Sequence, residues 1–196
     1  MSKPVAHLVH GFNVRDGGWS SLGPVLPHAT EAGWWPELFS WGWTFTFRLA
    51  MRTATAARHL APRLNDGDLI ICHSHGYQVA QKAVELRERR VQLIAYNPAA
   101  RRDERPHPAF ERVLVAYSPD DLALVAGRAW RKAVSVAPWR WGRPHPWGRL
   151  GKDGPDYDDP RVSAVKLPDG TGHSGPSSQP GLIRWAIDSG AIEAPL

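Results

Sequence analysis

Short apolar runs alternate with longer helix-like segments along this 196-residue chain, and this alternation limits the possible folds more than any other feature. The runs with the length and composition of buried strands are Val5–Val9, Glu37–Trp41, Leu69–His73, Leu93–Asn97, Val113–Tyr117 and Val162–Leu167. The helix-like segments are Ser20–Ala32, Phe47–Leu64, Gly76–Arg89, Leu122–Lys132 and Gly181–Ser189. Strands joined through helices pair in parallel, and the helices cover both faces of the sheet. The sequence therefore predicts a three-layer α/β fold with a mainly parallel sheet of about six strands.

Length and composition indicate a single soluble domain over residues 1–196, with 42% hydrophobic residues. No apolar run approaches the length of a transmembrane helix, and no basic segment followed by an apolar one suggests a secretory signal. The single cysteine, Cys72, cannot form an internal disulfide, so we expect a cytoplasmic location. Pro24 and Pro27 should make the first helix irregular. Residues 138–160, rich in Pro, Gly, Trp and Asp, are expected to form a long irregular excursion.

The segment Cys72-His73-Ser74-His75-Gly76 connects the apolar residues 69–71 to a helix-like segment. A strand that ends in a serine and turns at once into a helix projects the hydroxyl above the sheet edge. The same turn aims the free amides of the helix N-terminus at developing negative charge. Ser74 is therefore the candidate nucleophile, and the alternative is a serine that only caps the helix.

A nucleophilic serine needs a base, and the base needs a third group that orients it. In an open parallel sheet these groups should lie at the carboxyl ends of the strands. His173 follows the last predicted strand, in a glycine-rich turn over residues 170–175, and Asp120 and Asp121 follow the preceding strand. The segment His10-Gly11-Phe12-Asn13 follows the first strand, where a glycine lets the backbone turn towards the serine.

These motifs, each after its own strand in the order nucleophile, acid, histidine, resemble the α/β-hydrolase superfamily, and small serine esterases and lipases in particular. The resemblance extends from His10-Gly11 to the final helix. It implies that Ser74 is the nucleophile and His173 the general base, and that the backbone N–H groups of Phe12 and His75 form the oxyanion hole. The family pattern is Gly-x-Ser-x-Gly, and here Cys72 replaces the first glycine, at a position that needs only a small side chain.

The acid is chosen between two neighbouring carboxylates. The family often places an aliphatic residue three positions after the acid, and Leu124 stands at that spacing from Asp121, whereas Asp120 has Ala123 there. We therefore prefer Asp121 as the catalytic acid and keep Asp120 as the alternative. The aspartate that is not used is expected to cap the helix that begins nearby.

No metal or cofactor is expected. His10, His73 and His75 have no accompanying acids or cysteines at metal-ligand spacing, so a zinc site is a weak alternative. The four aspartates between residues 153 and 159 match no EF-hand loop, although hard cations prefer several oxygen ligands. A solvated turn is the preferred interpretation of that acidic segment.

Seven basic residues, with no acid among them, lie between residues 128 and 152 and interleave with four tryptophans. Together with a net charge of +5, they suit either a solvated basic surface or the binding of nucleic acid, sugar or lipid. We give preference to the solvated surface, and nucleic acid is not the expected partner.

The sequence thus predicts a metal-independent serine hydrolase with a minimal cap that cleaves carboxylic esters, either small or linked to a lipid or polymer. The same residues would serve a thioesterase or an acyltransferase. The alternative from a different class is a non-catalytic binding protein that uses the basic Trp/Arg surface. The oligomeric state is not predicted.

Overall fold

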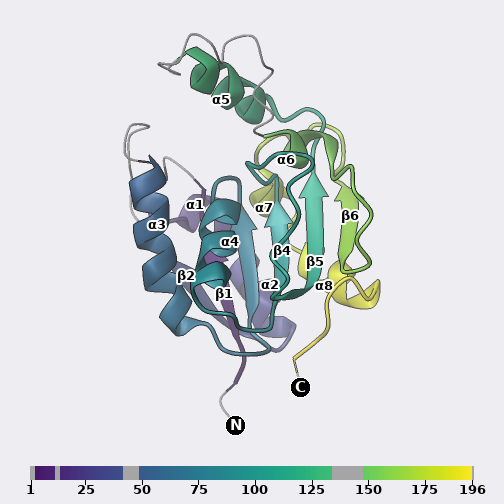
Figure 1. The fold of residues 1–196 in the computed structure, drawn as a ribbon. Helices are drawn as coiled ribbons and strands as arrows, with labels where there is room; N and C mark the ends of the chain where they lie inside the picture. Colours follow the sequence, from purple (N-terminus) through teal and green to yellow (C-terminus); the bar gives the residue numbers. More distant parts are fainter. Residues whose placement is uncertain (1–2, 12–13, 42–48, 134–147, 196) are drawn as a thin grey trace.

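A computed structural model describes residues 3–11, 14–41, 49–133 and 148–195, and its centre is one parallel sheet (Figure 1). The six strands follow the order β2-β1-β3-β4-β5-β6, and all neighbouring strands pair in parallel. Their bounds are β1 Val5–Val9, β2 Trp35–Phe39, β3 Leu69–His73, β4 Val91–Tyr96, β5 Phe110–Tyr117 and β6 Val162–Lys166. The predicted α/β fold with a parallel sheet is confirmed, and the sheet is wholly parallel.

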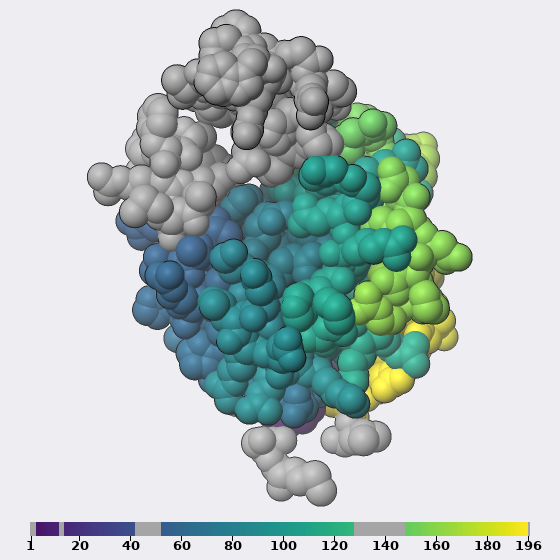
Figure 2. Space-filling model, viewed as in Figure 1, coloured from purple at the N-terminus to yellow at the C-terminus, as the bar shows by residue number. Residues whose placement is uncertain are grey.

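Helices cover both faces of the sheet (Figure 1). One face carries α3 (Leu49–Leu60) and α4 (Gly76–Leu86), whose buried residues share a core cluster with one set of strand side chains. The other face carries α1 (Trp19–Leu22), α2 (Leu26–Glu31) and α8 (Leu182–Asp188), which share a second cluster. Figure 2 shows the face on which the side chains of α3 and α4 lie over the sheet. Because side chains alternate along each strand, every central strand contributes to both clusters.

The predicted helix Ser20–Ala32 is divided into shorter pieces. The chain forms α1, a 3₁₀ turn over Gly23–Val25 and then α2, with a proline in the first turn of each of the last two elements. Pro24 and Pro27 have no amide hydrogen to donate, so each begins a new helical segment instead of continuing the previous one. The irregularity that the two prolines predict is therefore present.

Two helices, α5 (Leu122–Ala133) and α6 (Arg149–Asp153), lie beyond the carboxyl ends of the strands, and α7 (Gly175–Ser178) lies level with the tip of β4 (Figure 1). The sequence did not predict α6 or α7. The expectation of an irregular excursion over residues 138–160 is wrong where α6 forms, because Leu150 is fully buried in the core cluster on the α3 and α4 side. Residues 138–147 of that excursion lie outside the described residues.

Among the helices that the structure describes, none combines the length and the apolar composition needed to span a bilayer.

Candidate active site

Ser74 occupies a sharp turn between β3 and α4. Its φ of 54° lies in the left-handed region, which residues with a β-carbon rarely adopt. The surrounding backbone holds this conformation in place, because the Ser74 N–H donates to the Tyr96 carbonyl oxygen at 2.9 Å and the Ser74 carbonyl oxygen accepts from the Ala99 N–H at 3.0 Å. Backbone strain that is fixed by its neighbours in this way is common at functional sites.

Two glycines allow the backbone to pass close to this turn. A β-carbon added to Gly76 would lie 2.3 Å from the carbonyl oxygen of Val9, so the first turn of α4 packs directly against the end of β1. A β-carbon added to Gly11 would lie 2.9 Å from Ser74 Cβ. The segment after β1 therefore runs directly beside the serine. Phe12, the first predicted oxyanion donor, follows Gly11 in sequence but lies outside the described residues.

His75, the second predicted oxyanion donor, is the residue that directly precedes α4, so its backbone lies at the N-terminus of that helix. Its ring turns towards α3, where Nε2 lies 2.9 Å from Thr53 Oγ1. A backbone N–H at a helix N-terminus points along the favourable end of the helix dipole, as stabilisation of an oxyanion requires.

His10 supports the segment after β1 from within the core. Its Nδ1 donates to the Gly11 carbonyl oxygen at 2.8 Å, and its Nε2 accepts from the Trp41 N–H at 3.3 Å. The His10 imidazole stacks on the Trp41 indole, with ring centroids 5.4 Å apart. Burial lowers the pKa of His10, so this histidine is neutral, and its two ring nitrogens hold the backbone at Gly11 and Trp41 by hydrogen bonds.

The predicted acid and base are brought together. Asp121 lies directly before α5 with its carboxylate fully buried, and its Oδ2 is 2.7 Å from Nδ1 of His173. Its other oxygen accepts from the Leu124 N–H at 3.0 Å, so Asp121 also satisfies an amide in the first turn of α5. Asp120 instead accepts from the backbone N–H of Gly170. The expectation that the second aspartate caps the helix is therefore wrong, because Asp121 caps α5 itself.

His173 lies in the turn between β6 and α7, and its side chain is 31% exposed. Its Nδ1 faces Asp121, so Nε2 lies on the opposite edge of the ring. Within the part of the chain that the structure describes, no hydrogen bond joins this ring to the Ser74 hydroxyl. Such contacts are often long in free enzymes and shorten when substrate binds.

His73, the residue before the serine, contacts the base directly. Its Nε2 lies 2.9 Å from the backbone carbonyl oxygen of His173, and the two ring centroids are 4.6 Å apart. Burial, and secondly the neighbouring His173, lowers the pKa of His73 to about 3, so the ring is neutral and Nε2–H donates. The sequence singled out His73 only as a weak candidate for a metal ligand. Among the described residues, no group of three or more His, Cys, Asp or Glu side chains is placed to hold a metal ion.

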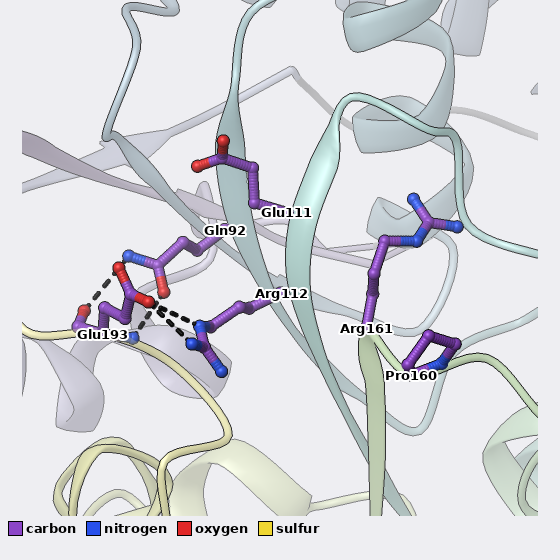
Figure 3. Close-up of a pocket in the computed structure, with 6 residues that line it drawn as sticks. All are labelled: Gln92, Glu111, Arg112, Pro160, Arg161 and Glu193. Carbon is purple, nitrogen blue, oxygen red and sulfur yellow. Dashed lines mark hydrogen bonds and ion pairs between the residues drawn. The ribbon is translucent and has the colours of Figure 1, made fainter.

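A polar cavity of about 390 Å³ lies at the opposite edge of the sheet (Figure 3). It is lined by Gln92, Glu111, Arg112, Pro160, Arg161 and Glu193, all at or near the amino ends of β4, β5 and β6 or near the C-terminus. Its charged groups are paired within the protein: Arg112 with Glu193, Arg161 with Asp159 and Glu111 with Arg90. Ser74, Asp121 and His173 lie at the other end of the strands, so this cavity is no part of the candidate active site.

No protein-family model and no curated protein sequence matches the chain. Solved structures do match over nearly all of it. A "probable hydrolytic enzyme" from Pseudomonas aeruginosa PAO1 is 16% identical with a TM-score of 0.57, over 97% of this chain and 86% of that one. The monoacylglycerol lipase of Paleococcus ferrophilus is 14% identical with a TM-score of 0.50, over 96% of both chains. Carboxylesterase CesB from Bacillus subtilis is 10% identical with a TM-score of 0.51, over 97% of this chain and 85% of that one. The chain therefore has the fold of the α/β-hydrolase superfamily.

Proposed function

We propose that this protein is a serine hydrolase that cleaves carboxylic esters through an acyl-enzyme, with Ser74 as nucleophile, His173 as base and Asp121 as acid. One arrangement carries the proposal: a serine in a left-handed strand-to-helix turn lies at the same edge of the sheet as a buried carboxylate paired with a histidine at 2.7 Å. The similar structures include an enzyme named as a lipase and one named as a carboxylesterase, which supports ester hydrolysis.

In the first half of the reaction, the Ser74 hydroxyl oxygen attacks the ester carbonyl carbon and its proton passes to Nε2 of His173. Asp121 accepts a hydrogen bond from Nδ1, which keeps the lone pair on Nε2 and stabilises the positively charged ring. The tetrahedral intermediate then expels the alcohol, which leaves with the proton from Nε2. The serine is now acylated.

In the second half, a water molecule gives its proton to His173 Nε2 and attacks the acyl carbon. Collapse of this second intermediate releases the carboxylic acid and returns the proton to Ser74. In both intermediates the negative oxygen is held by the backbone N–H groups of Phe12 and His75. Losing one such donor typically costs about 3 kcal/mol of transition-state stabilisation.

The test is labelling with a fluorophosphonate probe, combined with hydrolysis of p-nitrophenyl esters of increasing acyl length. We expect the wild type to react, and Ser74→Ala and His173→Ala to lose both labelling and hydrolysis. Ser177→Ala is the matched control, because this serine in α7 is exposed and its hydroxyl donates to the Ser174 carbonyl oxygen within the same short helix. Ser74→Ala with full activity on every ester, or a folded wild type that the probe does not label, would overturn the proposal. Faster cleavage of matched thioesters would keep the mechanism and change the substrate class.

A further inference from the structure

Two side chains from the ends of neighbouring strands hold consecutive backbone carbonyls of the turn that carries the base. Asn97, which follows β4, donates from Nδ2 to the Gly172 carbonyl oxygen at 3.2 Å. His73, the last residue of β3, donates from Nε2 to the His173 carbonyl oxygen at 2.9 Å. The backbone on either side of the His173 Cα is thus tied to the sheet.

The orientation of the Asn97 amide is fixed by its surroundings. Its side chain is fully buried, and Nδ2 also lies 3.4 Å from the Gly151 carbonyl oxygen. Because both neighbours are acceptors, only the nitrogen of the amide can face them. The oxygen lies against Gly175, where an added β-carbon would be 2.5 Å from it.

The backbone of Asn97 is as unusual as that of the serine. Its φ is 45°, a conformation that asparagine tolerates better than most residues with a side chain. The left-handed turn directs the chain away from the end of β4, whose ladder continues through the bond from the Asn97 N–H to the Ala116 carbonyl oxygen at 2.8 Å. A glycine would suit this backbone equally well.

The same amide also reaches the loop of the acid. The Gly151 carbonyl oxygen accepts from the Ser118 N–H at 2.9 Å, and the Ser118 carbonyl oxygen accepts from the Asp121 N–H at 3.1 Å. The amide of Asn97 therefore connects the backbone next to His173 with the backbone that leads to Asp121. A shift of the turn that carries His173 or of the segment that leads to Asp121 would change the contact between the His173 and Asp121 side chains.

We propose that Asn97 and His73 are positioning residues that hold His173 against Asp121 and within reach of Ser74. The inference rests on the proposed serine hydrolase function. His173 is partly exposed and sits in a turn rich in glycine, so its own loop gives little rigidity. A displacement of a reacting group by about 1 Å costs on the order of 100-fold in rate, which is why such a base needs fixed supports.

The experiment compares variants that remove one hydrogen bond and keep the local shape. Asn97→Gly keeps the left-handed backbone and removes the amide, and His73→Phe keeps a ring beside His173 and removes the donor. His73→Gln is the conservative variant, because its amide nitrogen reaches about as far as the imidazole Nε2. Asn65→Gly is the matched control, since the Asn65 amide makes an exposed bond to the Arg63 carbonyl oxygen.

We expect Asn97→Gly and His73→Phe to lower kcat and the rate of fluorophosphonate labelling by roughly 10- to 100-fold, with KM unchanged. His73→Gln should recover most of the loss, and Asn65→Gly should match the wild type. A purely structural role would instead lower the melting temperature and leave kcat of the folded fraction unchanged. If Asn97→Gly does not fold, the His73→Phe and His73→Gln pair decides the question.

The outcomes separate this inference from the function on which it rests. A wild type that the probe labels, with labelling lost in His173→Ala and intact in folded Asn97→Gly and His73→Phe, overturns the positioning role alone. A wild type that the probe never labels overturns the serine hydrolase and the positioning role with it.

Discussion

Acidification should destabilise this protein through His73, a buried histidine at the end of β3. Burial, followed by the neighbouring His173 and His10, lowers its pKa from 6.5 to about 3. Between these two values the unfolded chain binds a proton that the native protein excludes. The free energy of unfolding therefore falls as the pH falls through this window. Above pH 6.5 His73 is neutral in both states, so its full contribution to the free energy of unfolding is present there.

The size of the effect follows from the two pKa values. From pH 7 to pH 5, His73 alone should remove about 2 kcal/mol from the free energy of unfolding. For a domain of this size that corresponds to a decrease in melting temperature of roughly 4–8 °C. Burial also lowers the pKa of His10, which adds to the loss in the wild type with the same sign.

The comparison of wild type with His73→Gln isolates the contribution of His73. Glutamine does not titrate, so the other histidines cancel in the difference between the two proteins. Urea unfolding at pH 7, 6 and 5 should show the wild type losing about 2 kcal/mol more than the variant. Stability curves that stay parallel over this range would contradict the prediction, because they would mean that native His73 binds its proton as readily as the unfolded chain does.

Substitutions at three further places test other parts of the structure: the turn at Gly76, the pair of aspartates at 120 and 121, and Asp68. Gly76→Ala should destabilise the fold by about 3 kcal/mol in thermal unfolding, because the added carbon would lie 2.3 Å from the Val9 carbonyl oxygen. Asp121→Asn should lower kcat by about 10³- to 10⁴-fold, whereas Asp120→Asn should stay near the wild-type rate, and equal effects would contradict the assignment of the acid. Asp68→Ala should cost about 3 kcal/mol in urea unfolding, since its buried carboxylate accepts from two backbone amides, each at 2.8 Å; an unchanged midpoint would argue against this network.

The buried centre of the sheet could be predicted closely because its strands are apolar on both faces. The predicted bounds of β1 and β3 agree with the structure, whereas β4 and β5 begin earlier than predicted. The first residues of these two strands include the polar residues Gln92, Glu111 and Arg112, which line the cavity at the amino edge and bond to other polar groups there. A search for apolar runs therefore misses the start of each strand. The prediction of Glu37–Trp41 for β2 is wrong at both ends. The strand is Trp35–Phe39, because it pairs with β1 from Val5 opposite Trp35 to Val9 opposite Phe39, and the sequence of β2 alone does not reveal this register.

The candidate site was predictable for a topological reason. Ser74, Asp121 and His173 each follow a strand, and a parallel sheet gathers the ends of its strands at one edge. The roles of Asn97 and His73 depend instead on which carbonyl oxygens come within reach once the turn at residues 170–175 has packed. No local pattern encodes such a long-range contact. The one local signal was the asparagine directly after the strand, because asparagine is common in turns and tolerates a left-handed backbone.

Cys72 shows which parts of the serine turn are constrained. Its side chain is fully buried in the core cluster on the α3 and α4 side, and burial raises the pKa of the thiol, so the sulfur packs as a small apolar group. The position tolerates a side chain because it points into a helix-covered layer. Gly76 tolerates none, because the carbonyl oxygens at the end of β1 already occupy the space. The departure from Gly-x-Ser-x-Gly therefore lies at Cys72, where a small side chain needs only to fit the core. Glycine is kept at position 76, where the backbone of α4 contacts the backbone at the end of β1.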